Sequence, residues 1–260
     1  MEKQKICIVG GGLTGLITAI TLSKLNLQID LITDENYNKK TKTNRTTAIS
    51  QNNYDFLKKL NTLKYSRNEF WPCSNMKLYM MDDKKKLNEI FDINKLDKEV
   101  LYMMDNSLII KQMKKKIKNI KSISLKTKKK ILGFKDSGLL KSIKSKNKKN
   151  SKYNLIIVCT GGGSNLSKIV SGDQLINYSY EEVSVTINVK HNSTNNNTAR
   201  QIFLENGILA LLPISETKTS IVWSVKKNIK NKNKNNKNFF LKKEIQFYIK
   251  NFFKKVKFVS

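Results

Sequence analysis

Apolar residues near the N-terminus follow a strand–helix–strand pattern. A short apolar run at residues 6–9 predicts a buried strand, and the glycine-rich segment GGGLTG at 10–15 follows it directly. An apolar helical stretch comes next, and then a second strand that ends in acidic residues. This order of elements is the one that a dinucleotide-binding βαβ unit requires.

The pattern downstream predicts two kinds of region. Helical periodicity appears at 53–60, 106–117 and 239–253, and strand-like runs appear at 71–91, 122–145, 155–158, 182–189, 208–213 and 220–225. The segments near the N-terminus, at 107–165 and at the end of the chain are typical of an α/β domain. Residues 70–100 and 175–226 are typical of a separate antiparallel sheet. The sequence therefore predicts an α/β fold in which the chain passes between two domains.

The glycine loop carries the clearest chemistry. Gly10 permits a tight turn, Gly12 lets a pyrophosphate approach the backbone, and Gly15 lets the helix pack closely on the strand. The N-terminus of the helix offers unpaired N–H groups and the positive end of its dipole to the phosphates. We therefore expect an adenine-dinucleotide site at this loop.

A second glycine cluster follows the apolar strand at 155–158. A continuous apolar run of this kind fits a strand that is buried on both faces of a parallel sheet. The residues after it, Thr160 to Gly163, place close backbone approach at the carboxyl end of the strand. Ligands of α/β folds bind at that edge of the sheet.

The uncharged N-terminal stretch also has a targeting interpretation. A basic start followed by an uncharged run to Ser23 resembles a signal peptide or a membrane span. Three glycines and several hydroxyl residues interrupt the run, however, and no small-residue cleavage site follows it. No other segment is long and apolar enough to span a bilayer. We therefore expect a cytoplasmic protein, and peripheral contact with the inner membrane is compatible with this expectation.

The formal charge of +30 raises the question of a nucleic-acid partner. Only Arg45, Arg67 and Arg200 are arginines, so 47 of the 50 basic residues are lysines. Arginine is the preferred residue for bidentate contacts with phosphates and bases. We favour a solvated lysine coat, such as an AT-rich genome produces, over a specific nucleic-acid function. The same basic surface would help docking onto anionic lipid headgroups.

Cysteine and histidine usage gives little support to other chemistry. Cys7, Cys73 and Cys159 are odd in number and lack CxxC spacing, which favours buried thiols in a reducing compartment over disulfides or a metal site. His191 is the only histidine and stands in a polar stretch, so we expect an exposed loop residue and not a general base. No metal is expected.

Three motifs in order along the chain resemble one family. They are the glycine loop, the segment RTTAIS at 45–50, and FLENGILALLP at 203–213 followed by SIVWS at 220–224. Together they are similar to the FAD-dependent aromatic hydroxylases of ubiquinone biosynthesis, which share the p-hydroxybenzoate hydroxylase fold. The resemblance implies an FAD-binding Rossmann-like three-layer domain interleaved with an antiparallel-sheet substrate domain. It also implies ring hydroxylation of a polyprenylated phenol with NAD(P)H and O2.

The resemblance also implies positions for the domains and the site. The FAD-binding domain is expected at 1–68 and 105–172, with 238–260 as its returning helix, and the substrate domain at 69–104 and 173–237. A hydrophobic aromatic substrate and a ubiquinone-biosynthesis complex are the partners it suggests. No catalytic residue is assigned. The expected cofactor-binding residues are Gly10, Gly11, Gly12, Leu13, Thr14, Gly15, Asp34, Glu35, Arg45, Thr160 and Gly161.

Three departures from the family pattern concern the flavin. Thr33 stands where the family has a glutamate for the ribose hydroxyls, and Asp34 takes that role if the strand end shifts by one residue. Thr160 stands where the family has the aspartate of an Asp-Gly motif. The Gly-Asp motif that follows the helix at 239–253 in the family is missing before Ser260. We therefore expect an N-terminal portion of a hydroxylase.

Other functions stay open on the sequence. One is an FAD- or NAD-dependent oxidoreductase without oxygen chemistry, and another is an inactive remnant that no longer holds FAD. The third is a basic protein that binds nucleic acid or membrane through its lysines, which steep salt-dependent retention on DNA would reveal.

Overall fold

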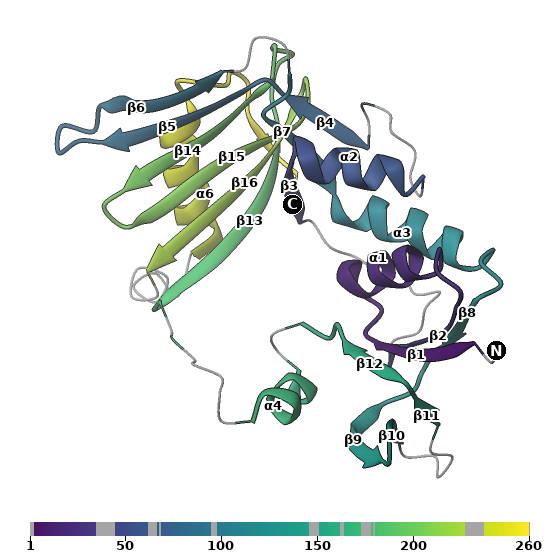
Figure 1. Cartoon of the computed structure of the whole chain (residues 1–260). Coiled ribbons are helices and arrows are strands. Elements are labelled where there is room, and N and C mark those ends of the chain that lie inside the picture. The colour runs from purple at the N-terminus through teal and green to yellow at the C-terminus, as the bar shows by residue number, and fades with distance from the viewer. Residues whose placement is uncertain are drawn as a thin grey trace. The chain divides into compact units, whose positions relative to one another are not determined.

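The computed structural model divides the chain into two compact units (Figure 1). Unit 1 comprises residues 1–42, 57–64 and 107–177, and unit 2 comprises residues 43–56, 65–106 and 178–260. The structure describes residues 3–34, 45–61, 67, 69–94, 98–145, 151–161, 164–172, 178, 180–226 and 237–259, with the side chains of 237–240 excepted.

A four-stranded parallel sheet forms the centre of unit 1. Its strand order is β12-β1-β2-β8, so the first strand lies in the middle and pairs in parallel with both neighbours. Apolar side chains fill both faces of β1, where Ile6, Cys7, Ile8 and Val9 are all buried. The continuous apolar runs of the sequence therefore fold as expected for a sheet covered on both sides. The bounds are β1 (Gln4–Val9), β2 (Leu27–Ile32), β8 (Ile123–Lys126) and β12 (Leu155–Val158).

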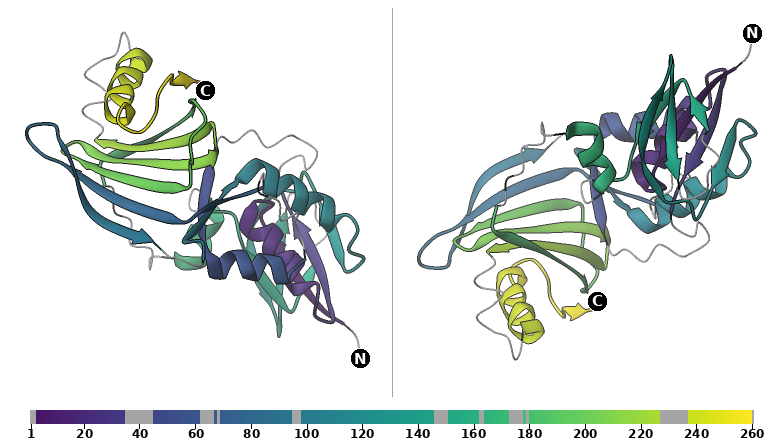
Figure 2. Two further views of the ribbon diagram at one scale, coloured as in Figure 1. Left: turned by 90° about the horizontal axis from the view of Figure 1, so that it is seen from above. Right: turned by 90° about the horizontal axis from the view of Figure 1, so that it is seen from below.

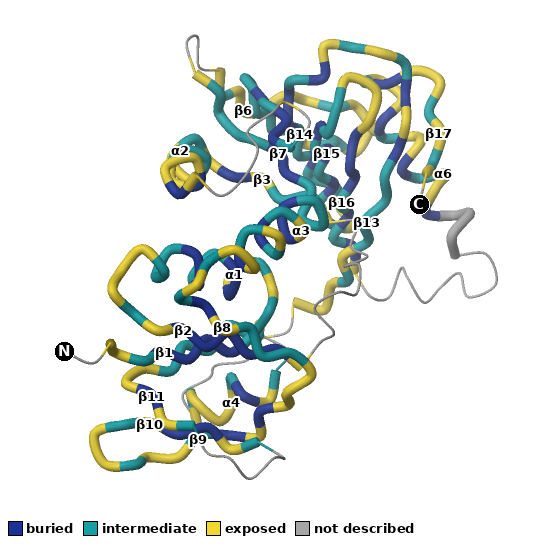
Figure 3. Tube along the Cα trace, turned by 90° about the vertical axis from the view of Figure 1, so that its right-hand side faces the viewer, coloured by how far each residue is buried: buried dark blue, intermediate teal, exposed yellow. Residues whose placement is uncertain are grey.

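Two further layers cover this sheet. Helices α1 (Leu13–Leu22) and α3 (Asn106–Ile117) lie on one side, and the antiparallel strands β9 (Ile131–Ser137), β10 (Leu140–Ser145) and β11 (Lys152–Tyr153) lie on the other (Figure 3). A cluster of buried side chains joins the sheet to these strands, and Cys7, Ile143 and Tyr153 are its central members. A short helix, α4 (Asn165–Ser171), follows β12. The expected three-layer α/β arrangement is confirmed.

A seven-stranded sheet forms the centre of unit 2. Its order is β17-β13-β16-β15-β14-β5-β6, and all pairs are antiparallel except β14 with β5, which run parallel. The expected antiparallel sheet is thus present with one parallel pair inside it. The bounds are β5 (Asn75–Met81), β6 (Leu87–Asn94), β13 (Glu182–Lys190), β14 (Thr198–Leu204), β15 (Gly207–Ser215), β16 (Lys218–Lys226) and β17 (Lys257–Phe258).

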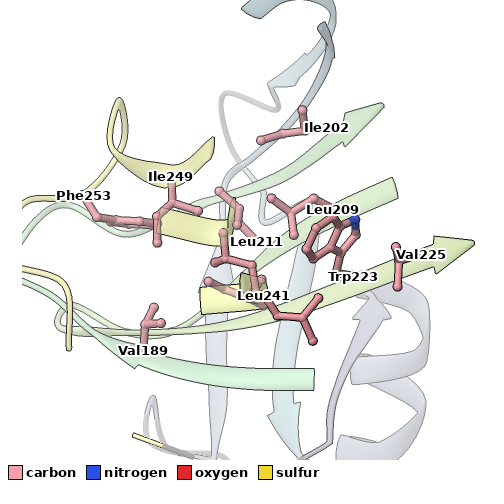
Figure 4. Packing of buried hydrophobic residues seen from close by; sticks show 11 residues of the cluster. Val189, Ile202, Leu209, Leu211, Trp223, Val225, Leu241, Ile249 and Phe253 are labelled. Atoms are coloured by element: carbon pink, nitrogen blue, oxygen red, sulfur yellow. The ribbon is translucent and has the colours of Figure 1, made fainter. Parts of the chain in front are cut away.

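Helix α6 (Lys237–Ile249) covers one face of the seven-stranded sheet (Figure 2). Leu241, Ile245 and Ile249 recur every four residues and form one apolar stripe on the helix, and Phe253 follows beyond its end. They pack with Leu209, Leu211, Ile221 and Trp223 of the sheet in one buried cluster (Figure 4).

The expectation that residues 238–260 return to the FAD-binding domain is therefore wrong. The apolar stripe of α6 finds its complementary surface within unit 2, and residues 178–260 belong to that unit as a whole. The burial of Leu241, Ile245 and Ile249, at about 1.5–3 kcal/mol each, stabilises the helix on this sheet.

A small three-stranded sheet completes unit 2. Its order is β3-β7-β4, with bounds β3 (Thr46–Ser50), β4 (Phe70–Cys73) and β7 (Leu101–Asp105). Trp71, Cys73 and Met103 pack with Ala199 of the large sheet. Residues 43–56 and 65–68 consequently belong to unit 2, although the sequence placed them in the first domain. Helix α2 (Gln51–Lys59) follows β3 directly.

His191 is buried, and the expectation of an exposed loop residue is wrong. Only 6% of its surface is exposed, and its ring stacks on Phe253 at 4.2 Å between centroids. Nδ1 lies 2.8 Å from the carbonyl oxygen of Asn192, and Nε2 lies 3.0 Å from Oγ1 of Thr219. The backbone contact makes Nδ1 the donor, so Nε2 accepts from the threonine hydroxyl. Burial lowers the pKa of His191, against the contact with Asn192 that raises it.

Candidate functional site

The turn between β1 and α1 depends on glycine at two positions. Gly10 has a φ of +125°, and a Cβ there would lie 2.3 Å from the carbonyl oxygen of Cys159. A Cβ on Gly15 would lie 2.0 Å from the carbonyl oxygen of Gly10. Neither position accepts a larger residue without moving backbone. The loop is therefore held tightly between β2 and β12, and the N–H of Gly10 donates to Ile32 across that junction at 2.8 Å.

Gly12 lies on the open side of the same loop. A Cβ there would meet nothing within 4 Å, although Gly12 is the N-cap residue of α1. No side chain of the described residues caps this helix end, so the first N–H groups of α1, beginning at Leu13 and Thr14, have no side-chain partner there. A helix end of this kind attracts a phosphate through its N–H groups and its dipole.

The end of β2 presents Thr33 and Asp34 beside the loop. Thr33 is buried, and its N–H donates to the carbonyl of Lys126 at 2.9 Å, which continues the pairing of β2 with β8. A Cβ on Gly11 would lie 2.9 Å from Oγ1 of Thr33, so the glycine makes room for that hydroxyl. Asp34 is exposed and follows at once. Glu35, also expected in the site, lies outside the described residues.

The end of β12 contributes the third side of the site. The N–H of Cys159 donates to Val9 at 2.7 Å, and Gly161 has a φ of +77°. Oγ1 of Thr160 is buried and has no hydrogen-bond partner among the described residues. A buried hydroxyl without a partner costs about 1–3 kcal/mol, which a bound ligand would recover.

These three strand and loop ends surround one cavity of about 370 Å³. The expected residues Gly10, Gly11, Gly12, Leu13 and Thr14 line it, together with Asp34, Thr160 and Gly161. Thr33, Cys159 and Ile110 of α3 line it as well, and the sequence did not assign them to the site. Cys159 was identifiable from its place directly after an apolar strand. Ile110 had no signal of its own, since it is one of several apolar residues on a helix.

Arg45 lies in unit 2, directly before β3. Its side chain is exposed, and its carbonyl accepts from the N–H of Asn106 at 3.2 Å. Contact between Arg45 and a bound dinucleotide stays a prediction.

The cavity fits part of an adenine dinucleotide. It has a backbone approach without side chains at Gly12, an uncapped helix end, a carboxylate at Asp34 and an unpaired hydroxyl at Thr160. Its volume lies at the lower end of the range for small-molecule sites, which run from about 300 to 1,000 Å³. In the part of the chain that the structure describes, no group of three or more His, Cys, Asp or Glu side chains is placed to bind a metal ion.

The buried carboxylate of Asp30 lies within the same sheet, and the sequence had not indicated a role for it. Asp30 of β2 is 4% exposed, and its Oδ2 accepts from Lys126 Nζ at 2.6 Å and from the Tyr153 hydroxyl at 2.7 Å. The Lys5 ammonium lies 3.5 Å away. Burial would raise the pKa of Asp30, but the two hydrogen bonds and the two lysine charges lower it overall.

The cysteines of unit 1 are protonated thiols. Burial together with the negative charge of Asp30 raises the pKa of Cys7 to about 12. Burial also raises the pKa of Cys159, against a hydrogen bond with Thr18 that lowers it. Neither thiol is a nucleophile at neutral pH, because only the thiolate reacts.

The second candidate surface is the face of the seven-stranded sheet opposite α6, here called the far face. Strand register places eighteen uncharged residues from the middle of six strands on it, and Glu182, Lys190, Lys218 and Lys226 stand on the same face at the ends of β13 and β16. The residues are Asn88, Phe91 and Ile93 of β6; Met76, Leu78 and Met80 of β5; Ala199, Gln201 and Phe203 of β14; Ile208, Ala210 and Leu212 of β15; Ser220, Val222 and Ser224 of β16; and Ser184, Thr186 and Asn188 of β13.

Met80 and Phe91 are 51% and 52% exposed, and most of the other far-face residues are half-buried. Ala199 and Ser220 are buried, and Ala199 packs against Trp71 and Met103 of the small sheet. The exposed apolar part of this face therefore lies on β5 and β6.

Several solved structures share this arrangement of elements. A p-nitrophenol 4-monooxygenase from Pseudomonas putida covers the whole of this chain with a TM-score of 0.70 and 12% identity, over 67% of its own length. PqsL of Pseudomonas aeruginosa, titled a probable FAD-dependent monooxygenase, matches 88% of this chain and 62% of its own with a TM-score of 0.70 and 10% identity. This chain has the fold of the FAD-dependent monooxygenases.

A third structure with this fold is described as a reductase. A geranylgeranyl bacteriochlorophyll reductase-like protein from Thermoplasma acidophilum covers the whole chain and 65% of its own, with a TM-score of 0.70 and 16% identity. The fold is therefore not confined to structures titled monooxygenase.

Sequence comparison finds distant relatives of one kind. The ubiquinone biosynthesis monooxygenases COQ6, described as mitochondrial, are 24% identical in Danio rerio and 25% identical in Drosophila melanogaster, over 86% of this chain. The chain spans about half the length of these curated relatives. No protein-family model matches it. Within the described ranges, every helix is too short or too polar to cross a bilayer.

Proposed function

We propose that this chain provides the dinucleotide site and the substrate sheet of an FAD-dependent aromatic hydroxylase. The observation that carries the proposal is the cavity at the glycine loop, which combines an uncapped helix N-terminus with the unpaired hydroxyl of Thr160. The distant relationship to COQ6 supports a polyprenylated phenol of ubiquinone biosynthesis as the substrate.

The residues of unit 1 would hold the FAD. The N–H groups of Leu13 and Thr14 would bind its pyrophosphate, and Asp34 would accept from its ribose hydroxyls. Thr160 would donate its hydroxyl to the cofactor. Arg45 belongs to unit 2, and only the resemblance suggests that it would add a positive charge for the phosphates. When bound, FAD supplies the redox chemistry, in which NAD(P)H delivers electrons and O2 supplies the oxygen atom that enters the aromatic ring.

The residues of unit 2 would bind and orient the substrate. The middle of the far face has no charged side chain, so a docked aromatic ring would displace no ionic group from water, and water would be excluded from beneath it. None of the eighteen uncharged residues is an acid or a base, so their role in the reaction would be positioning. Peripheral contact with the inner membrane and membership of a ubiquinone-biosynthesis complex are part of the same proposal, because the substrate is a lipid.

Reconstitution with FAD tests the proposal. The protein is incubated with FAD, freed of excess ligand and examined for flavin absorbance, and oxygen uptake is then measured with NAD(P)H and a chainless phenol. We expect bound flavin and oxygen uptake that the phenol stimulates. A protein that retains no FAD under these conditions would contradict the proposal and favour an inactive remnant.

A second function, a flavin-dependent reductase, is favoured by one observation. A structure described as reductase-like has the same fold over the whole chain. Oxidation of NAD(P)H that proceeds without oxygen and reduces an added acceptor would support it over the hydroxylase.

A further inference from the structure

A basic cavity lies in unit 1 at the edge where the parallel strands begin. Its volume is about 500 Å³, and three of the six residues that line it are lysines while none is acidic. The lining residues are Lys3, Lys5, Gln28, Leu140, Lys152 and Asn154. Strands β1, β2 and β12 run from this edge toward the glycine loop, which follows the opposite end of β1. The basic cavity and the candidate FAD site are therefore at opposite ends of one sheet.

The outer face of the β9–β11 sheet continues the basic surface of the cavity. Tyr153 belongs to the cluster that packs on the parallel sheet, so the neighbouring position, Lys152, faces the other way. Strand register aligns Lys152, Ser142 and Lys135 in one row across β11, β10 and β9. Leu140 stands on the same face of β10 and also lines the cavity, so the two surfaces are continuous. We call Lys3, Lys5, Lys135 and Lys152 together the basic edge.

Lysine is concentrated around the basic edge beyond its level in the whole chain. Residues 128–152 contain ten lysines in 25 positions, against 47 in 260 for the chain, and a single acidic residue, Asp136. Asp136 pairs with Lys141, so Lys135 and Lys152 form no ion pair within the described residues. Like charges gathered on one surface repel each other, and an anionic partner would relieve that repulsion.

Exposed leucines stand at the same end of unit 1. Leu139 is fully exposed in the turn between β9 and β10, and Figure 3 shows this turn at the end of unit 1 where β1 begins. Leu25, two residues before β2, is 58% exposed, and Leu155, the first residue of β12, is 50% exposed. The turn does not require a leucine, because turns favour Gly, Asn, Asp and Ser. Its side chain is available to an apolar partner.

We propose that the basic edge and Leu139 dock unit 1 onto an anionic lipid surface. Leu139 would enter the boundary between headgroups and acyl chains, and the lysines would bind headgroup phosphates. The proposal assigns a surface to the peripheral membrane contact within the proposed function, and in that respect it rests on that function. Docking at this edge would leave the glycine loop accessible, because the loop lies at the other end of the sheet.

Leu139 distinguishes a lipid surface from other anionic partners. A nucleic-acid site uses arginine and exposed aromatic rings that stack on bases. Residues 128–152 contain no arginine, and the ring of Tyr153 is buried. A soluble phosphate would bind the lysines and gain nothing from a leucine. A membrane surface uses both kinds of side chain at once.

Cosedimentation of the whole chain with vesicles tests the proposal. The vesicles contain phosphatidylcholine alone, or phosphatidylcholine and phosphatidylserine at roughly four to one. We expect the wild-type protein to bind the anionic vesicles only. Leu139→Ser should weaken this binding about tenfold. Lys135→Gln/Lys152→Gln should weaken it about twentyfold, at roughly fivefold for each lysine near the lipid surface.

Two matched variants change the same kinds of side chain elsewhere. Met80→Ser removes a half-exposed apolar side chain from unit 2. Lys111→Gln/Lys115→Gln removes the same charge from exposed positions of α3, which covers the other side of the parallel sheet (Figure 3). Both should bind the anionic vesicles as the wild-type protein does.

A polarity-sensitive dye on the Leu139→Cys variant reports whether this turn enters the lipid. The three natural cysteines are buried or half-buried, and burial raises the pKa of each, so the dye reacts preferentially at the introduced position. We expect a blue shift of the emission with anionic vesicles and none with inorganic phosphate. An unchanged emission with bound vesicles would contradict insertion of the turn.

Several results would overturn the proposal. Equal binding to neutral and anionic vesicles, or weaker binding of Met80→Ser while Leu139→Ser binds normally, would place the contact elsewhere. Retention of an oligonucleotide that the Lys135→Gln/Lys152→Gln variant loses, without vesicle binding, would identify nucleic acid as the partner. Binding of inorganic phosphate alone would identify a soluble anion. Failure of the proposed function is distinguishable, because vesicle binding is measured without FAD or a phenol.

Discussion

Replacement of Asp30 by asparagine tests the packing of the sheet that supports the glycine loop. The change keeps the size and shape of the side chain and removes its charge. In the wild-type protein, one oxygen of Asp30 accepts from Lys126 and from Tyr153, and Lys5 lies nearby. Asp30 is almost completely buried, whereas the Lys126 and Lys5 side chains are 24% and 39% exposed. The lysines therefore keep part of their hydration in the variant.

The expected loss of stability is about 2 kcal/mol. A hydrogen bond to a charged group contributes about 1.5–3 kcal/mol and a neutral one about 1 kcal/mol, so each of the two bonds weakens by about 1 kcal/mol. The lost attraction to Lys5 adds to this, and the lower cost of burying a neutral amide offsets it in part. For a chain of this size, that loss corresponds to a decrease in Tm of roughly 4–8 °C.

The effect depends on pH with a definite sign. Because the pKa of Asp30 is lowered in the folded protein, its stabilising contribution is fully present above the unfolded pKa of about 4. It is lost as the pH falls through the folded pKa, when the wild-type carboxyl becomes protonated. The stability difference between wild type and Asp30→Asn is therefore constant near neutral pH and shrinks below about pH 4.

Hydrogen exchange measured by mass spectrometry locates the effect. We expect faster exchange in peptides of β1, β2 and β8, together with a lower urea midpoint. Asp136→Asn is the matched control, because Asp136 forms an exposed ion pair with Lys141 in the same unit. Such pairs contribute at most about 1 kcal/mol. If Asp30→Asn and Asp136→Asn are equally stable across this pH range, the buried charge cluster has no structural role.

Three further predictions concern the loop, the unpaired hydroxyl and the buried histidine. Gly15→Ala places a Cβ against the Gly10 carbonyl and should weaken FAD binding at least about tenfold in a fluorescence titration, whereas Gly133→Ala, which meets nothing within 4 Å, should not. Thr160→Val should leave the Tm unchanged or raised, because the hydroxyl has no partner among the described residues, while FAD affinity falls; unchanged affinity would refute its role in binding. His191 has a lowered pKa in the folded protein, so wild-type stability should decrease as the pH falls from about 6.5, and His191→Gln should remove this dependence in thermal melts from pH 7.5 to 5.

Local pattern was sufficient for most elements of the fold. The first strand, the glycine loop and the helix at 106–117 form where periodicity predicts them. The destination of the last helix was not predictable in the same way. Its apolar stripe predicts that the helix packs against an apolar surface. The stripe does not indicate which of the two sheets provides that surface. The parallel pairing of β14 with β5 was not predictable either, because side chains alternate with period two in parallel and antiparallel strands alike.

The candidate site likewise contains residues that local pattern predicts and residues that only the tertiary structure reveals. The glycines and Thr160 follow strand ends, where α/β folds bind their ligands. Their positions in the sequence were therefore sufficient to predict that they lie in one site. Asp30 had a visible signal, because a carboxylate inside an apolar strand must have partners. Its partners, Lys126 and Tyr153, are separated from it by 96 and 123 residues, and no local pattern identifies them.

The apolar composition of a strand can arise from burial in the core or from burial by a ligand, and the far face illustrates the difference. Strand β15 is apolar on both faces, which by pattern alone indicates burial between two layers of protein. One of those faces is core, because α6 covers it with Leu241, Ile245 and Ile249. The other face is mostly half-exposed, and its central residues are uncharged, although Ala199 and Leu212 on it pack against Trp71, Cys73 and Met103 of the small sheet. Burial by a ligand and burial by the core leave the same sequence pattern, and only the position of α6 separates them. Under the proposed function, FLENGILALLP and SIVWS would supply a core on one side of the sheet and a substrate surface on the other.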